Sequence, residues 1–225
     1  MKTIQLKNGE HLSIHQLLAN DLPIIMQLQE EVIQSLDDKR SLQPLSEEEF
    51  MTILNGNGLM IGAFHHERLI AFRAMLYPKV DEAEHLAADA GIPQHEWSLV
   101  SYSEISTVHP SYRGQSLQKK MGYILFELVD QHMYRYVCAT VAPFNIPSLL
   151  DKFAQQMYIV ALKEKYNGLL RYILCRDFTF SGENGEEQCV VRMDHIIQQQ
   201  QLLDEGWRGV GIYEEQGQWY VRYCK

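Results

Sequence analysis

The sequence has 225 residues, enough for one sizeable hydrophobic core and an appended segment. Apolar residues make up 46% of it and charged residues 22%, which is typical of a globular protein. The formal net charge of -9 argues against a nucleic-acid partner, because phosphate backbones are held by clustered lysines and arginines.

Two hydrophobic periodicities divide the chain into helices and strands. Apolar residues spaced three and four apart predict a helix over 21–36, and Ser46 with Glu49 forms a capping box that begins a second helix. Further helices are predicted over 80–90, over 116–133, from about Pro147, and over 194–203. Alternating or continuous apolar runs predict strands over 12–17, 59–64, 69–77, 99–108, 136–141, 158–163, 169–178, 189–193, 209–213 and 219–223.

Turns and polar stretches complete this organisation. His65 and His66 lie in the turn of a predicted antiparallel hairpin, where we expect solvated side chains rather than metal ligands. Residues 181–185 are expected to form a hinge or hairpin turn, so we divide the chain into a domain over 1–180 and an extension over 181–225. The run of glutamines at 198–201 is expected to form a solvated helix face.

The compartment and the redox state follow from what the sequence lacks. No basic and then apolar leader begins the chain, and no apolar run approaches about 18 residues. We therefore expect a cytoplasmic protein without a membrane partner. The cysteines, at positions 138, 175, 189 and 224, show no metal-ligand spacing, so we expect neutral thiols and no metal site.

The most informative segment runs from Val108 to Gln118. It reads as the end of an apolar strand at Pro110, a tight turn at Arg113 and Gly114, and the start of an amphipathic helix. A junction of this kind directs successive backbone N–H groups at one point, and the helix dipole adds about half a positive charge there. The segment therefore predicts a site for a pyrophosphate group, held without a metal ion.

Two motifs resemble the GNAT superfamily of acyl-CoA-dependent N-acetyltransferases. They are Val108-x-Pro110-x-x-Arg113-Gly114-x-x-Leu117 and Ala142-Pro143-x-Asn145-x-x-Ser148-Leu149. The resemblance covers roughly residues 12–178. It implies an α/β fold with a mixed, mostly antiparallel sheet, helices on both faces, and parallel fourth and fifth strands that splay apart. The segment after residue 180 would be a C-terminal α/β extension packed on or next to this core.

The resemblance also implies where acetyl-CoA would bind as the acyl donor. Its pantetheine arm would pair with the edge of the strand that contains Ser106, Thr107 and Val108, as peptides do in β-augmentation. The remaining contacts would come from the turn, the helix that follows it and the second motif, namely Arg113, Gly114, Gln115, Ser116, Leu117, Gln118, Asn145 and Ser148. Two of these have plain alternatives: a surface ion pair for Arg113 and a turn-forming role for Asn145.

The sequence departs from the family pattern at three places. Ser116 and Gln118 stand where glycine or a small residue is expected, although neither change removes a backbone N–H. Lys152 occupies approximately the position at which many members carry a tyrosine that protonates the leaving thiolate. The Gly-aromatic pair that usually follows this helix is here Met157-Tyr158.

Acyl transfer to an amine needs a base, because an amine with a pKa of about 10.4 is almost wholly protonated at neutral pH. Glu104, in the expected fourth strand, is the candidate base, and its alternative is a solvent-facing or ion-paired strand carboxylate. Strand alternation places Tyr102 on the same face as Glu104. Tyr166 is the candidate acid, with Tyr158 as an alternative, and a backbone N–H near Thr107 or Val108 would polarise the carbonyl.

The expected function is transfer of an acetyl group from acetyl-CoA to a primary amine of a small molecule or peptide, by direct attack in a ternary complex. The alternative is a CoA-binding regulatory module of the same fold with little or no turnover. For the tail, residues 189–225, we expect a role either in a homodimer or in covering the acceptor site.

Overall fold

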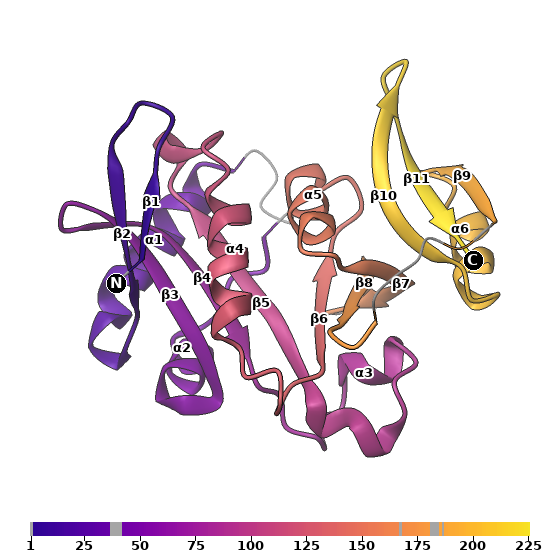
Figure 1. The fold of residues 1–225 in the computed structure, drawn as a ribbon, viewed down its shortest axis with the longest axis horizontal. Helices are drawn as coiled ribbons and strands as arrows, with labels where there is room; N and C mark the ends of the chain where they lie inside the picture. Colours follow the sequence, from indigo (N-terminus) through magenta and orange to yellow (C-terminus); the bar gives the residue numbers. More distant parts are fainter. Residues whose placement is uncertain (1, 37–41, 167, 181–184, 186) are drawn as a thin grey trace. The chain divides into compact units, whose positions relative to one another are not determined.

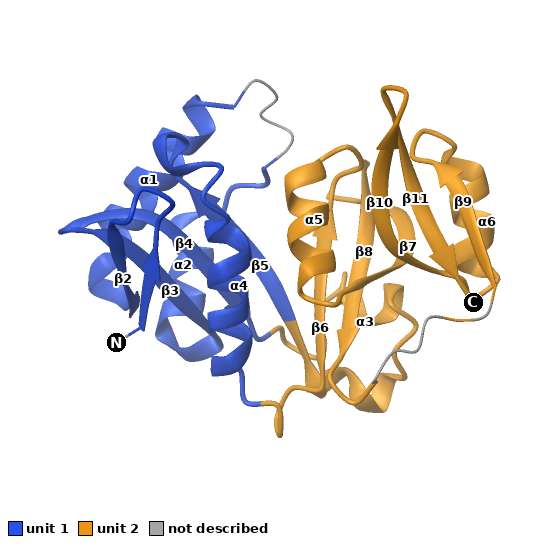
Figure 2. Cartoon of the chain, turned by 45° about the horizontal axis from the view of Figure 1, so that its top comes forward, with its two compact units in different colours: residues 1–77, 102–130 blue, residues 78–101, 131–225 orange. Residues whose placement is uncertain are grey.

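The structure, a computed structural model, describes residues 2–36, 42–166, 168–180, 185 and 187–225 (Figure 1). The chain forms two compact units: unit 1 of residues 1–77 and 102–130, and unit 2 of residues 78–101 and 131–225 (Figure 2). This division does not follow the boundary expected at residue 180, and that boundary stays a prediction. Most of the hinge expected at 181–185 lies outside the described residues.

Unit 1 is built on an antiparallel sheet with the strand order β1-β2-β3-β4-β5. Its strands are β1 (Lys2–Gln5), β2 (His11–Gln16), β3 (Gly58–His65), β4 (Arg68–Leu76) and β5 (Val100–Val108). The β3–β4 hairpin and the strand predicted over 99–108 are confirmed. β1 was not expected from the sequence, because its four residues are too few to show a clear periodicity.

One face of this sheet packs against α1 (Leu22–Gln34) and α2 (Glu47–Thr52). The capping box that begins α2 is confirmed: Ser46 Oγ accepts from the Glu49 N–H, and the Glu49 carboxylate accepts from the Ser46 N–H. Behind it, the rings of Phe50 and Phe72 meet edge to face with their centroids 5.8 Å apart. These contacts belong to an apolar cluster that also contains Ile105 of β5.

The other face of the sheet carries α4 (Leu117–Leu128). Phe72 and Ala74 belong to the cluster beneath α1 and α2, so the side chain between them points to the opposite face. That residue is Arg73, which donates to the carbonyl of Gln118 in the first turn of α4. The helix ends at Leu128 rather than at 133 as predicted, since Val129 is extended and buried while Leu128 is exposed.

Unit 2 holds a second run of strands in the order β6-β8-β7-β10-β11-β9, all paired antiparallel. They are β6 (Tyr136–Val141), β7 (Tyr158–Lys165), β8 (Leu169–Asp177), β9 (Gln188–Arg192), β10 (Arg208–Glu215) and β11 (Gln218–Cys224). Its helices are α3 (Leu86–Asp89), α5 (Ile146–Ala154) and α6 (Ile196–Asp204). The first residues of β5 also belong here, and Ser101 Oγ donates to the Tyr136 carbonyl.

These elements confirm the predicted fold class, a mixed α/β fold with a mostly antiparallel sheet and parallel β5 and β6. The splaying of those two strands stays a prediction. No helix among the described residues is long and apolar enough to cross a membrane.

Two local predictions were wrong because tertiary contacts overrode the sequence pattern. Instead of a helix over 80–90, only α3 forms: the carboxylates of Glu84 and Asp89 converge on the buried Nζ of Lys165, 3.2 and 2.9 Å away. His65 is not simply solvated, since its Nδ1 lies 2.6 Å from the hydroxyl of Tyr112 and its side chain is largely buried.

The C-terminal segment continues the sheet of unit 2. β10 pairs with β7 where Gly209 lies opposite Ile159, and a Cβ atom on Gly209 would come within 2.8 Å of the Ile159 side chain. Glycine therefore permits the close approach that joins the two strands. The strand, helix and hairpin predicted after residue 188 are confirmed, and the segment packs as part of unit 2.

A buried glutamine links α6 to this sheet. Gln199 is fully buried, and its Oε1 accepts from the hydroxyls of Tyr172 (2.7 Å) and Tyr223 (2.9 Å). Its Nε2 donates to the Met193 carbonyl at 2.7 Å. Burial raises the pKa of both tyrosines, so their hydroxyls remain protonated donors. The predicted solvated face is therefore wrong at this position, although Gln198 is exposed.

We expect Gln199→Leu to lower the free energy of unfolding by about 2–4 kcal/mol, because two buried hydroxyls and one buried carbonyl would lose their hydrogen-bond partner. Gln198→Leu is the matched control on the same helix and should change stability by less than about 0.5 kcal/mol. Urea unfolding of both variants measures the difference. Equal effects would contradict a structural role for the buried amide.

Candidate functional site

The junction between β5 and α4 has an uncommon backbone. After β5 a short helical turn covers Pro110–Tyr112, and Arg113 is extended. Gly114 and Ser116 then adopt left-handed conformations, with φ of 76° and 58°, and α4 begins at Leu117. Ser116 stands where the resembled family pattern has glycine. The positive φ at this position favours glycine, because glycine has no Cβ atom and adopts left-handed conformations without strain.

This backbone leaves a row of N–H groups exposed for a ligand. Within the described part of the chain, the backbone N–H groups of residues 114–119 donate to no protein acceptor. The next N–H group along the chain, that of Lys120, donates to the Ser116 carbonyl. The amide of Arg113 is different, because it donates to the Pro110 carbonyl at 3.2 Å. We call the amides of 114–119 the amide cradle. Such a row at a helix N-terminus favours an anion.

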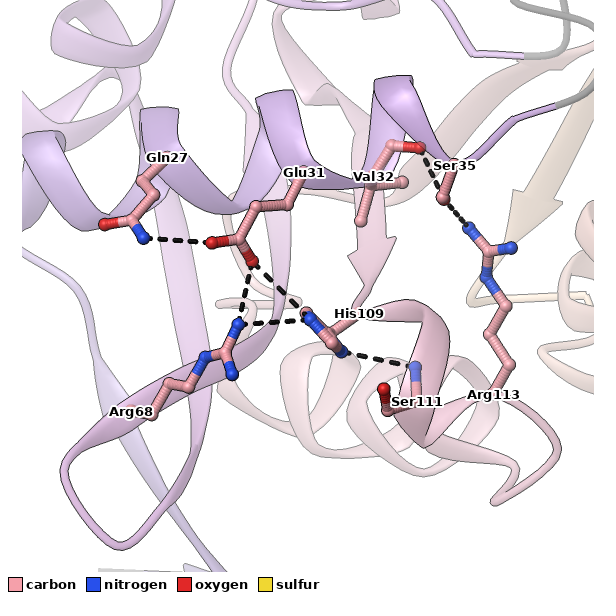
Figure 3. Close-up of polar contacts among 8 residues, drawn as sticks. All are labelled: Gln27, Glu31, Val32, Ser35, Arg68, His109, Ser111 and Arg113. Atoms are coloured by element: carbon pink, nitrogen blue, oxygen red, sulfur yellow. Dashed lines mark hydrogen bonds and ion pairs between the residues drawn. The ribbon is translucent and has the colours of Figure 1, made fainter.

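Side chains fix the cradle to the rest of unit 1. Gln115 Oε1 accepts from the Lys7 N–H at 2.9 Å, and Leu117 is buried beneath the helix. The guanidinium of Arg113 donates to Ser35 Oγ at 2.8 Å, at the end of α1 (Figure 3). The expected contact between Arg113 and a phosphate stays a prediction. In the structure the guanidinium donates to a hydroxyl rather than forming the surface ion pair considered as its alternative.

A second polar group holds the turn before the cradle. His109 Nδ1 accepts from the Ser111 N–H, so a neutral ring carries its proton on Nε2 (Figure 3). That nitrogen lies 3.5 Å from Glu31 Oε2, which also accepts from Arg68 at 3.0 Å. Arg68 and His109 Nε2 lie 3.1 Å apart because both nitrogens point at the same carboxylate, that of Glu31. The short distance follows from this shared acceptor.

The environment of Glu31 keeps it ionised. A hydrogen bond from Gln27 Nε2, followed by the bond and charge of Arg68, lowers the pKa of this carboxyl against the opposing effect of desolvation. Sequence reasoning did not identify Glu31, Arg68 or His109 as a group. The first two lie 37 residues apart, and no local pattern indicates that they meet.

β5 supplies the remaining candidate residues of unit 1. In its pairing with β4, Ala74 lies opposite Ile105 and Met75 opposite Ser103, so Glu104 is the extra residue of a β-bulge. The bulge interrupts the alternation of side chains, so parity no longer assigns Tyr102 to the face of Glu104, and that placement stays a prediction. Glu104 itself is half-buried.

Two hydroxyls follow Glu104 on the same strand. Ser106 Oγ and Thr107 Oγ1 are buried, and neither has a hydrogen-bond partner among the residues that the structure describes. Buried polar atoms are rarely left without a partner, so each one indicates either a bound group or a cost in stability. Ser106, Thr107 and Val108 form the end of β5, and the turn over Pro110–Tyr112 joins them to the amide cradle.

The other candidates belong to unit 2. Asn145 Oδ1 accepts from the Ser148 N–H at 3.3 Å and so caps α5, which agrees with its turn-forming alternative. Tyr166 is partly exposed, and its hydroxyl lies 3.1 Å from Thr140 Oγ1. Lys152 is buried, with its Nζ 3.7 Å from the Asp151 carboxylate. Roles for these residues toward a cofactor or substrate stay predictions.

The described residues contain no group of three or more histidine, cysteine, aspartate or glutamate side chains that could hold a metal ion. The site that emerges in unit 1 therefore consists of backbone donors, two buried hydroxyls and a half-buried carboxylate. It can bind an anion along the main chain and accept a proton nearby.

Comparison with known proteins finds likeness in structure but not in sequence. No protein-family model and no curated protein matches the chain. Among solved structures, the GNAT domain of PAT from S. lividans is 14% identical with a TM-score of 0.55, and the match covers 78% of this chain and 96% of that domain.

Two further structures agree. YncA of Salmonella typhimurium, named as a putative acetyltransferase and solved with acetyl-CoA, is 8% identical with a TM-score of 0.56, over 79% of this chain and 100% of its own. An alanine N-acetyltransferase of a ribosomal protein from Escherichia coli is 15% identical with a TM-score of 0.56, over 77% and 97%. The resemblance to the GNAT superfamily is therefore confirmed at the level of the fold.

We expect Ser116→Gly to raise the free energy of unfolding by about 0.5–1 kcal/mol, because it relieves a left-handed conformation that costs an L-residue about 1–2 kcal/mol. Ser111→Gly is the control: this serine is also exposed but has a negative φ, so glycine there should destabilise. Thermal and urea unfolding compare the two. A loss of stability in both variants would contradict strain at Ser116.

A second prediction concerns pH. Because the pKa of Glu31 is lowered from its ordinary value of 4.5, its stabilisation is present above that value and is lost as pH falls through the folded pKa. The difference in unfolding free energy between wild type and Glu31→Gln should thus be largest near neutral pH and shrink in acid. Glu30→Gln, exposed on the same helix, is the control. A difference that does not change with pH would contradict the charge pairing.

Proposed function

We propose that this protein is an acyltransferase that moves an acetyl group from acetyl-CoA to a primary amine. The observation that carries the proposal is the amide cradle of residues 114–119, at the end of β5 in a chain with the fold of N-acetyltransferases. Enzymes of this fold have been solved with acetyl-CoA or coenzyme A. The cradle suits the pyrophosphate that these donors carry.

The residues present fit such a donor. A diphosphate needs several convergent donors, and the cradle offers successive amides at the positive end of α4. The amide-rich pantetheine arm is proposed to pair with the backbone of β5 at Ser106 and Thr107. The side chains of these two residues lie on opposite faces of the strand, so one of the two buried hydroxyls can face the arm. Arg113 from the turn, with Asn145 and Ser148 from unit 2, completes the proposed binding set.

When bound, acetyl-CoA supplies an activated thioester, and the protein must supply the proton transfers. Glu104, half-buried at the bulge of β5, is proposed as the base that takes a proton from the acceptor ammonium, directly or through water. A backbone N–H of β5 near Thr107 is proposed to polarise the carbonyl. Tyr166, whose hydroxyl contacts Thr140, is the proposed acid for the departing thiolate.

The state of the thiols supports direct attack by the amine rather than a covalent enzyme intermediate. A hydrogen bond with Cys175, together with complete burial, raises the pKa of the Cys138 thiol. Burial also raises the pKa of Cys189. A protonated thiol is a poor nucleophile, so neither group suits acyl capture.

The alternative is a CoA-binding regulatory module with little turnover. It is favoured by Lys152, which stands near the position of the usual acid, is buried, and lies beside the Asp151 carboxylate. In this case the amide cradle would still bind the donor. The two functions therefore differ in turnover and not in affinity.

We expect Glu104→Gln to lower the rate of acetyl transfer at neutral pH about 100-fold, with nearly unchanged acetyl-CoA affinity, because the amide cannot accept the proton. Glu164→Gln, exposed on β7, is the matched control and should keep full activity. The measurement is thiol release from acetyl-CoA over a panel of amines, with calorimetry for binding.

Three other outcomes are informative. Full activity of Glu104→Gln would exclude this base. Acetyl-CoA binding by the wild type without turnover on any amine would favour the regulatory module. Absence of acetyl-CoA binding by the wild type would overturn both functions.

A further inference from the structure

Two cysteines lie directly opposite each other in the sheet of unit 2. In the antiparallel pairing of β6 with β8, Cys138 stands opposite Cys175, and both are free thiols. Opposite residues of such a pair project their side chains from the same face of the sheet. The two thiols are also in contact, since a hydrogen bond joins them. They therefore form a neighbouring dithiol within one compact unit.

The spacing of the two strands suits a disulfide between these cysteines. Directly opposite Cα atoms in antiparallel strands are about 4.5 or about 5.5 Å apart, depending on whether the pair exchanges backbone hydrogen bonds. Disulfides span Cα separations of about 4.4–6.8 Å. Both kinds of pair fall within this range, so the bond can form while the two strands stay paired.

The other two cysteines of unit 2 do not have this arrangement. In the pairing of β11 with β9, Cys189 lies opposite Tyr223 and Cys224 lies opposite Gln188. Consecutive residues of a strand point to opposite faces of the sheet, so Cys224 and Cys189 project from different faces. An intact sheet therefore keeps these two thiols apart, and they serve as an internal control.

The two opposed thiols differ in their access to solvent. Cys138 is completely buried, whereas Cys175 is partly exposed, so a dissolved reagent reaches Cys175 first. The hydrogen bond with Cys175, complete burial and the charge of Asp89 raise the pKa of the Cys138 thiol. Conversion of Cys175 to a mixed disulfide removes the first of these causes. Cys138 therefore becomes easier to ionise after Cys175 has reacted.

We propose that Cys138 and Cys175 are a redox modification site, which a low-molecular-weight disulfide such as oxidised glutathione converts into an intramolecular disulfide. The thiolate of Cys175 attacks one sulfur of the oxidant, forming a mixed disulfide and releasing one glutathione thiolate. The thiolate of Cys138 then attacks the sulfur of Cys175 and expels the second. Two protein thiols are oxidised, and their protons end on two molecules of reduced glutathione.

The fold, rather than the order of cysteines along the chain, selects this pair. Cys175 is nearer in sequence to Cys189 than to Cys138, and closing a shorter loop costs less entropy. Oxidation of the unfolded chain should therefore favour the bond between Cys175 and Cys189. Oxidation of the folded chain should give the bond between Cys138 and Cys175.

The experiment incubates the folded full chain with oxidised glutathione, blocks the remaining thiols with an alkylating agent, and identifies the products by intact mass and peptide mapping. The wild type should lose two of its four thiols, retain no glutathione and contain one cross-link, between Cys138 and Cys175. Dithiothreitol should restore all four thiols. The same reaction in urea is the unfolded reference.

Single variants separate the two steps. Cys138→Ser should stop at the mixed disulfide and keep one glutathione on Cys175. Cys175→Ser should leave the buried Cys138 as a thiol. Cys189→Ser is the matched control in the same unit and should form the bridge at an unchanged rate. Melting curves check the fold of each variant, and Cys138→Ala replaces Cys138→Ser if a buried serine unfolds the protein.

Four results would overturn the proposal. They are a folded wild type that keeps four thiols while dithiothreitol in the same buffer is oxidised, a cross-link to Cys189 or Cys224 in the folded chain, glutathione that stays on Cys175 of the wild type, and a bridge between Cys138 and Cys175 that forms only in urea. The proposal is independent of the acyltransferase function, so a failure to bind acetyl-CoA does not affect it.

Discussion

The path of the main chain from β5 into α4 is the constraint on which the candidate site depends. The chain turns through two left-handed residues, Gly114 and Ser116, and the helix then begins without a side-chain cap. A capping side chain would satisfy one of the first N–H groups, whereas here the whole row of residues 114–119 remains available within the described structure. Strain at Ser116 and uncapped amides lower stability, and an anionic ligand can offset both.

The surroundings of this turn show how such a backbone is maintained. The side chain of His109 caps the preceding turn, Arg113 reaches the end of α1, and Arg73 holds the Gln118 carbonyl from beneath. Each contact connects the junction to a different element of unit 1. Because several elements hold the turn, its conformation follows from the packing of the unit as a whole. A backbone held in this way is preorganised, which lowers the cost of binding a ligand.

Unit 2 shows the same dependence of polar contacts on packing. Its C-terminal strands extend the sheet through the close approach at Gly209, and Gln199 joins α6 to β8 and β11 by bonds with two tyrosines. A satisfied polar network of this kind fixes one arrangement of the elements, since any other leaves buried hydroxyls without partners. The C-terminal segment is thus part of the packing of unit 2, with its function in dimerisation or acceptor covering still open.

Local pattern was enough to place most of the helices and strands, because hydrophobic periodicity, the Ser46–Glu49 capping box and the turn residues act over a few positions. The same local logic predicted an anion site after Val108, since strand, turn and helix start are contiguous. Packing between residues far apart decided the rest: the bulge at Glu104, the burial of Gln199 and the position of Arg73 behind the cradle. A periodic pattern predicts which apolar face of a helix or strand is buried. Which polar side chains are buried depends on the tertiary structure, because their hydrogen-bond partners come from distant parts of the chain.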